Sequence, residues 1–103
     1  MFNTLLEAIP LIFALTTTPL APAESGLASF YEGVGGSGEM TCAHRTRKMG
    51  SMVTVTYRGK TVRCRVNDRG PFVKGRVIDL SVTAARALDM VDSGVVMVLL
   101  EGD

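Results

Sequence analysis

The alternation of apolar and polar residues along the chain predicts a small domain built mainly from β-strands. Residues 52–57 place Val53, Val55 and Tyr57 on one face, and residues 62–66 alternate strictly between apolar and polar side chains. This period of two is typical of strands that bury one face. Arg58-Gly59 lies between the two segments and predicts a tight reversal, so we expect a β-hairpin. Arginine is an unusual choice for such a turn where both central positions need positive φ.

Shorter apolar runs predict the remaining elements. Three of them have the length of a strand: 27–31, 77–80 and 95–100. Ser81 is a favourable N-cap for the helix-favouring residues that follow it, which predicts one short helix at about residues 81–89. Gly-rich and Pro-containing stretches separate these segments. The pattern predicts a mostly β protein of five or six strands and one short helix, with a small barrel as the leading architecture.

The first 23 residues differ in composition from the rest of the chain. Residues 8–15 form an apolar core that is too short to cross a bilayer as a helix. Ala21-Pro22-Ala23 then places small residues at the two positions that a signal peptidase inspects. We therefore expect residues 1–23 to be a signal peptide, or an N-terminal anchor without cleavage, and residues 24–103 to be the mature domain. The segment departs from the usual pattern because it carries Glu7 and neither Lys nor Arg.

Charge is unevenly distributed although the net charge is only +1. Ten of the eleven basic residues lie between Arg45 and Arg76, and Asp68 is the only acidic residue in that stretch. Either these residues lie on solvated strand faces, or they line a cleft that faces a polyanion or a glycan. The net charge alone predicts no nucleic-acid or membrane partner.

The two cysteines, Cys42 and Cys64, form an even pair in a short chain. An oxidising compartment would allow them to form a disulfide, and otherwise they would be ordinary core residues. His44 is the only histidine, so the sequence holds no His/Cys cluster with metal-binding spacing. We expect neither a metal ion nor a cofactor.

The residues that remain for chemistry are carboxylates and one histidine. Asp68 lies in a Gly/Pro turn at a strand end, and Asp79 interrupts an apolar run. Their spacing is consistent with two barrel segments that meet at one cleft. Structural roles are equally available: Asp68 can cap its turn, and Asp79 can accept amide hydrogen bonds where the helix at Ser81 begins. A lone histidine such as His44 is usually an ordinary half-buried side chain.

Four segments together resemble the RlpA (rare lipoprotein A) family. Residues 66–81 are similar to the longest motif of that family, and three shorter segments match in order: 26–31, 41–46 and 84–88. The resemblance covers residues 26–101. It implies a six-stranded double-psi β-barrel, related to barwin, expansins and family 45 endoglucanases.

The resemblance also implies an activity: endolytic lytic transglycosylase action on peptidoglycan strands, with strands lacking stem peptides preferred. One carboxylic acid suffices there, because the C6 hydroxyl of muramic acid attacks the anomeric carbon. By the match, Asp79 is the proton donor and Asp68 supports it. We expect the substrate-binding residues to be His44, Glu39, Tyr31 and Arg69.

This chain departs from the family in the loop before Thr41, which is shorter here and puts one wall of the cleft in doubt. We expect no SPOR domain and a monomer, in the periplasm or cell envelope. Two other functions stay open. One is a non-catalytic, expansin-like module that binds glycan. The other is a secreted inhibitor of barwin type, which is weaker because those domains carry more cysteines.

Overall fold

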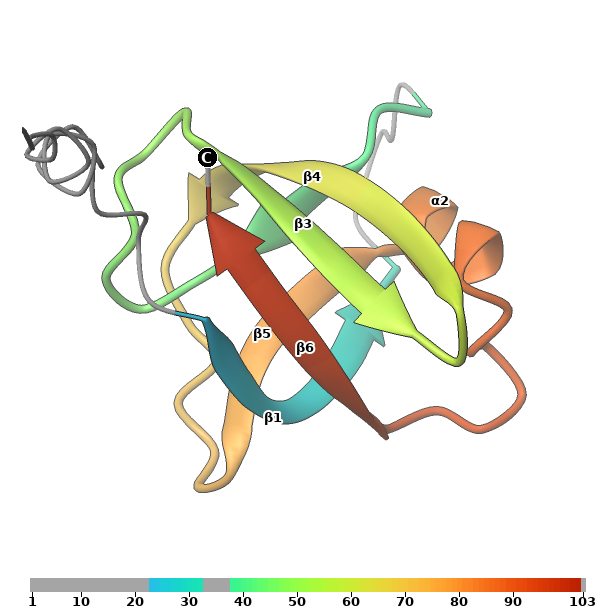
Figure 1. Ribbon diagram of the computed structural model, residues 1–103. Helices are drawn as coiled ribbons and strands as arrows, with labels where there is room; N and C mark the ends of the chain where they lie inside the picture. The colour runs from blue at the N-terminus through green and yellow to red at the C-terminus, as the bar shows by residue number, and fades with distance from the viewer. Residues whose placement is uncertain (1–22, 33–37, 103) are drawn as a thin grey trace, which may run out of the picture.

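The computed structural model describes residues 23–32 and 38–102, and its strands close into a barrel (Figure 1). The order around the barrel is β1-β5-β2-β4-β3-β6. The mostly β class and the six-stranded barrel with one short helix are confirmed. The elements are β1 (Glu24–Tyr31), β2 (Thr41–Ala43), β3 (Met52–Tyr57), β4 (Lys60–Asp68), β5 (Arg76–Ser81), α2 (Val82–Ala87) and β6 (Val96–Gly102).

Two strands, β1 and β2, each lie between two other strands that are consecutive in the sequence. β2 lies between β4 and β5, parallel to the first and antiparallel to the second. β1 lies between β5 and β6, again parallel to one and antiparallel to the other. This repeated insertion interlocks the chain and is the arrangement expected of a double-psi barrel. It also brings residues far apart in sequence onto neighbouring strands.

The predicted hairpin is present as β3 and β4, with Val53 opposite Cys64. Its turn has positive φ at both central residues, 49° at Arg58 and 79° at Gly59. Glycine adopts this conformation without strain, whereas arginine does not. The Arg58 guanidinium lies 5.4 Å from the centre of the Tyr57 ring, and this cation–π contact offsets part of the strain.

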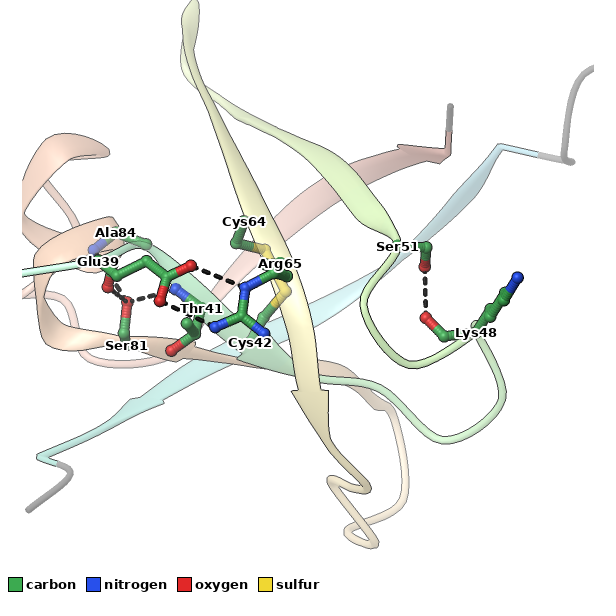
Figure 2. Close-up of a disulfide and its surroundings, with 9 residues drawn as sticks. All are labelled: Glu39, Thr41, Cys42, Lys48, Ser51, Cys64, Arg65, Ser81 and Ala84. Atoms are coloured by element: carbon green, nitrogen blue, oxygen red, sulfur yellow. Dashed lines mark hydrogen bonds and ion pairs between the residues drawn. A yellow bond between two sulfur atoms is a disulfide. The ribbon is translucent and has the colours of Figure 1, made fainter.

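The barrel core is formed by the inward side chains of all six strands and by α2. Cys42 and Cys64 are both fully buried there, and they form a disulfide with a Cα–Cα distance of 5.8 Å (Figure 2). The bond joins the neighbouring strands β2 and β4 on their core-facing side. The other fully buried, larger side chains of the core are Val53, Val55, Val66, Ile78, Leu80, Leu88, Met90 and Leu100.

The helix is slightly shorter than expected, and β2 is an addition to the predicted segments. Ser81 caps α2 by accepting a hydrogen bond from the Ala84 amide at 3.4 Å. Asp89, with φ of 58°, follows the helix and ends it. β2 has only three residues, too few to show a periodic pattern. The expected signal segment lies outside the described residues except for Ala23, and no helix among the described residues is long and apolar enough to cross a membrane.

Candidate active site

The two aspartates lie in one row of residues that crosses four neighbouring strands. Ala43 of β2 is paired with Asp68 of β4 on one side and with Asp79 of β5 on the other. Asp79 is in turn paired with Ser29 of β1. Strand alternation places Ser29, Ala43 and Asp79 on the side opposite the core, because the residues that precede them, Ala28, Cys42 and Ile78, are buried inside the barrel. A register shift in β4 aligns Asp68 with the same row. The barrel therefore brings together both predicted catalytic carboxylates.

A single small residue separates the two aspartates. Neighbouring strands lie ~4.8 Å apart, so the backbones of Asp68 and Asp79 are about 10 Å apart across β2. The residue between them is Ala43, which has a small side chain and is itself buried. Asp68 is exposed and Asp79 is half-buried, so both carboxylates can contact a substrate that lies on this face.

Asp79 is half-buried, and its Oδ1 accepts a hydrogen bond from the Ser29 hydroxyl. Its position in the middle of β5 explains the apolar sequence around it, since Ile78 and Leu80 point into the core. The alternative role of capping the helix entry belongs instead to Ser81. Ser29, fifty residues away in sequence, is a site residue that the sequence did not reveal.

Asp68 is exposed at the end of β4, beside a bulge. The register of β2 against β4 shifts between Cys42 and Ala43, so Asn67 is the extra residue. Oδ1 of Asp68 accepts a hydrogen bond from the Arg69 amide at 2.8 Å. This contact is the turn-capping role considered for Asp68, and the exposed position also leaves the carboxylate open to a substrate.

His44 follows β2 directly and is buried, with 4% of its surface exposed. Its Nδ1 accepts hydrogen bonds from the amides of Thr46 and Arg47, both at 3.1 Å. Its Nε2 lies 2.8 Å from a carboxylate oxygen of Glu24, at the start of β1. Both ring nitrogens are therefore engaged within the protein, and substrate binding by His44 stays a prediction. The sequence analysis did not identify Glu24 as part of the site.

Arg69 connects the turn after His44 to the end of β4. Its Nη1 donates to the backbone carbonyls of His44, at 3.1 Å, and of Arg47, at 2.6 Å. Arg45 fastens the following loop in a similar way, donating from Nη1 to the carbonyls of Pro71 and Arg76. These contacts join the segment between β4 and β5 to the turn that follows β2. Substrate binding by Arg69 stays a prediction.

Glu39 lies at the opposite end of β2 from the two aspartates. Arg65 of β4 donates two hydrogen bonds to its carboxylate, at 2.7 and 2.8 Å (Figure 2). These bonds hold the pKa of the Glu39 carboxyl below its usual value of 4.5, and the pKa of Arg65 is raised. Ser81 braces the same segment by accepting from the Thr41 amide at 3.1 Å and donating to the Glu39 carbonyl. Substrate binding by Glu39 stays a prediction.

Two aromatic residues lie on the elements that form the site. Tyr31 ends β1 and shares its strand face with Ser29, and it is half-buried. Phe72 lies in the loop after Asp68 and is 79% exposed, the largest exposed fraction among the large hydrophobic residues described. Arg45 holds this loop in place by donating to the Pro71 carbonyl, next to Phe72. A solvent-exposed aromatic ring in such a loop is a candidate contact for a ligand. The sequence analysis assigned no role to Phe72.

No group of three or more His, Cys, Asp or Glu side chains suited to a metal ion occurs within residues 23–32 and 38–102. Carboxylates such as those of Asp68 and Asp79 can transfer a proton or stabilise a positive charge.

A family model described as lytic transglycolase matches residues 23–100. The chain belongs to this family. The RlpA resemblance is thereby confirmed, since the curated relatives are named RlpA. The strand order and the family model together confirm the double-psi barrel. The chain is 48% identical over 91 residues to a probable endolytic peptidoglycan transglycosylase RlpA of Nostoc, covering 74% of this chain and 24% of the relative. It is 39% identical over 102 residues to the endolytic peptidoglycan transglycosylase RlpA of Vibrio cholerae, covering 86% of this chain and 39% of that protein.

Solved structures with lower sequence identity show the same fold. A Streptomyces papain inhibitor has a TM-score of 0.66 at 24% identity, covering 84% of this chain and 98% of the inhibitor. The expansin of Clavibacter michiganensis has a TM-score of 0.68 at 23% identity, covering 80% of this chain and 50% of the expansin. The chain spans between 19% and 39% of the length of the curated RlpA relatives considered.

Proposed function

We propose that this domain is an endolytic lytic transglycosylase that cleaves the glycan strands of peptidoglycan. The observation that carries the proposal is the row in which Ala43 separates Asp68 from Asp79, on the outer side of the barrel. The curated relatives, named as endolytic peptidoglycan transglycosylases, support the choice of substrate. Because the chain covers only part of each relative, activity has to be tested on this chain itself.

In the proposed reaction Asp79 acts first as an acid and then as a base. Protonated Asp79 gives its proton to the glycosidic oxygen as the bond to the anomeric carbon breaks. The C6 hydroxyl of the same muramic acid then attacks the anomeric carbon and passes its proton to the Asp79 carboxylate. The products are an anhydro-muramic end and a new hydroxyl end, and Asp79 regains its starting state. No water enters the reaction.

Asp68 and Ser29 have supporting roles in this mechanism. Asp68, as a carboxylate across β2, stabilises the positive charge that develops at the anomeric carbon. The Ser29 hydroxyl donates to Oδ1 of Asp79 and so fixes the orientation of the carboxyl group. The other oxygen, Oδ2, then carries the proton that is transferred.

Aromatic and polar residues around the row are proposed to bind the glycan. Phe72 offers an exposed ring face to a sugar, and Tyr31 extends along the same strand face as Ser29. His44, Glu39 and Arg69 are proposed contacts by family resemblance. We further propose that the domain prefers glycan strands without stem peptides. Attached peptides would hinder access of the glycan to the row of residues that contains Asp68 and Asp79.

We propose that the protein is exported to the periplasm or cell envelope, where peptidoglycan lies, and that it acts as a monomer. Residues 1–23 would be removed after the Ala21-Pro22-Ala23 motif. The intact mass of protein recovered from the envelope reports its first residue. A start at Glu24 is expected, and an intact Met1 would establish an anchored form instead.

A glycan-binding module without activity is the second candidate function. The short segment before β2 favours it, because Glu39 is held against Arg65 rather than beside the two aspartates. The test is to incubate the purified protein with glycan strands that carry or lack stem peptides, and to analyse the products by mass spectrometry. Anhydro-muramic ends, more abundant from the bare strands, are expected. Sedimentation with the strands and no product would establish the binding module.

A further inference from the structure

We infer that Glu24 is a positioning residue, which acts through His44 to hold Asp68 in place. The inference rests on the proposed function, because it assigns Asp68 a part in the reaction. Glu24 and His44 belong to segments that are not paired in the sheet: β5 separates β1 from β2 around the barrel. The contact between them is therefore an added connection rather than a consequence of strand pairing.

The hydrogen bonds of His44 define which nitrogen carries the proton. Nδ1 accepts from two backbone amides, those of Thr46 and Arg47, so it is unprotonated. The proton therefore lies on Nε2, which donates to Oε1 of Glu24 at 2.8 Å. The Arg47 guanidinium lies 3.7 Å from the same oxygen. Glu24 thus fixes both the tautomer and the orientation of a buried ring.

The backbone of His44 connects the fixed imidazole ring to Asp68 through hydrogen bonds. The His44 amide donates to the Asp68 carbonyl at 3.1 Å. The His44 carbonyl accepts from Arg69, which is the residue whose amide also donates to the Asp68 carboxylate. Asp68 itself lies at an exposed strand end beside a bulge, where the β-ladder alone constrains it weakly. Glu24 is therefore linked to Asp68 through His44, a buried residue that forms hydrogen bonds with both.

Glu24 and Glu32 lie at and just beyond the two ends of β1, and they provide a matched set of variants. Glu24→Ala removes the acceptor, whereas Glu24→Gln keeps a carbonyl oxygen that can accept from Nε2. Glu32→Gln is the control, since Glu32 is an exposed residue just beyond the other end of β1. We expect Glu24→Ala to lower kcat about tenfold with little change in KM, the effect of losing one positioned hydrogen bond. Glu24→Gln should restore most of kcat, and Glu32→Gln should match the unmodified protein.

Two NMR measurements separate this inference from the proposed function. Nitrogen-15 shifts of the imidazole in the unmodified protein should show the proton on Nε2 of His44. Exchange of the His44 amide, which bonds Asp68, should be about tenfold faster in Glu24→Ala and unchanged in Glu32→Gln.

A proton on Nδ1 would overturn the inference without any variant, so it stays testable if Glu24→Ala does not fold. Equal kcat and equal amide exchange in Glu24→Ala and Glu32→Gln would overturn it as well. If the unmodified protein cleaves no glycan, the proposed function fails, while the tautomer and exchange results still decide whether Glu24 positions Asp68.

Discussion

Replacing Asp79 with asparagine separates its chemical role from its structural one. The asparagine side chain would keep a carbonyl oxygen in the place of Oδ1, so the Ser29 hydroxyl can still donate to it. Asp79 is only half-buried, and one neutral hydrogen bond contributes ~1 kcal/mol, so the free energy of unfolding should change by about that amount or less. An asparagine side chain cannot deliver a proton, however. Loss of a general acid lowers kcat by roughly a hundredfold or more.

The assay is the rate at which anhydro-muramic ends form from glycan strands without stem peptides, with thermal unfolding and strand sedimentation measured on the same samples. Asp89→Asn is a matched control, because Asp89 is exposed and its φ of 58° suits asparagine. We expect Asp79→Asn to fold and to bind strands but to form almost no product. Normal activity in Asp79→Asn would refute the assignment and make Glu39 the next candidate acid. A protein that no longer folds would show that Asp79 is structural.

Three further predictions concern the disulfide, the exposed aromatic ring and the ion pair beside β2. Reducing Cys42–Cys64, which closes a sequence separation of 22, should lower the free energy of unfolding by roughly 3–4 kcal/mol, and denaturant titration with and without reductant checks this. Phe72→Ala should raise KM about fivefold or more with kcat and the melting temperature unchanged, since the ring is 79% exposed; an unchanged KM would exclude stacking. The Arg65 hydrogen bonds lower the pKa of Glu39, so the pair stabilises the fold above pH 4.5 and loses its effect as the pH falls through the lowered pKa. A carboxyl NMR titration should show a higher Glu39 pKa in Arg65→Met, and identical values in both proteins would contradict the assigned cause.

The architecture follows from local sequence where a pattern repeats over enough residues. The alternation in 52–57 and 62–66 predicted the hairpin, and Ser81 predicted the start of the helix, because these signals arise from neighbouring residues. β2 was not predicted as a separate strand because three residues cannot show a period. Its place between β4 and β5 depends on closure of the whole barrel.

The candidate site divides in the same way. Asp68 and Asp79 stood out because a carboxylate in a turn or in an apolar run is conspicuous in sequence. Ser29 and Glu24 did not, since their partners lie 50 and 20 residues away and meet them only when β1 joins the barrel. His44 was considered as a substrate contact, but a sequence cannot show that both ring nitrogens are engaged. Such long-range contacts determine which polar residues are left to bind a ligand.

The most direct test of the proposed reaction is to run it in water labelled with oxygen-18 and to measure the masses of the glycan products by mass spectrometry. A lytic transglycosylase uses the C6 hydroxyl of its own substrate, so each cleavage should give one anhydro-muramic end and one hydroxyl end, and neither end should carry the label. Labelled reducing ends would mean that water attacks the anomeric carbon, and they would contradict the mechanism assigned to Asp79.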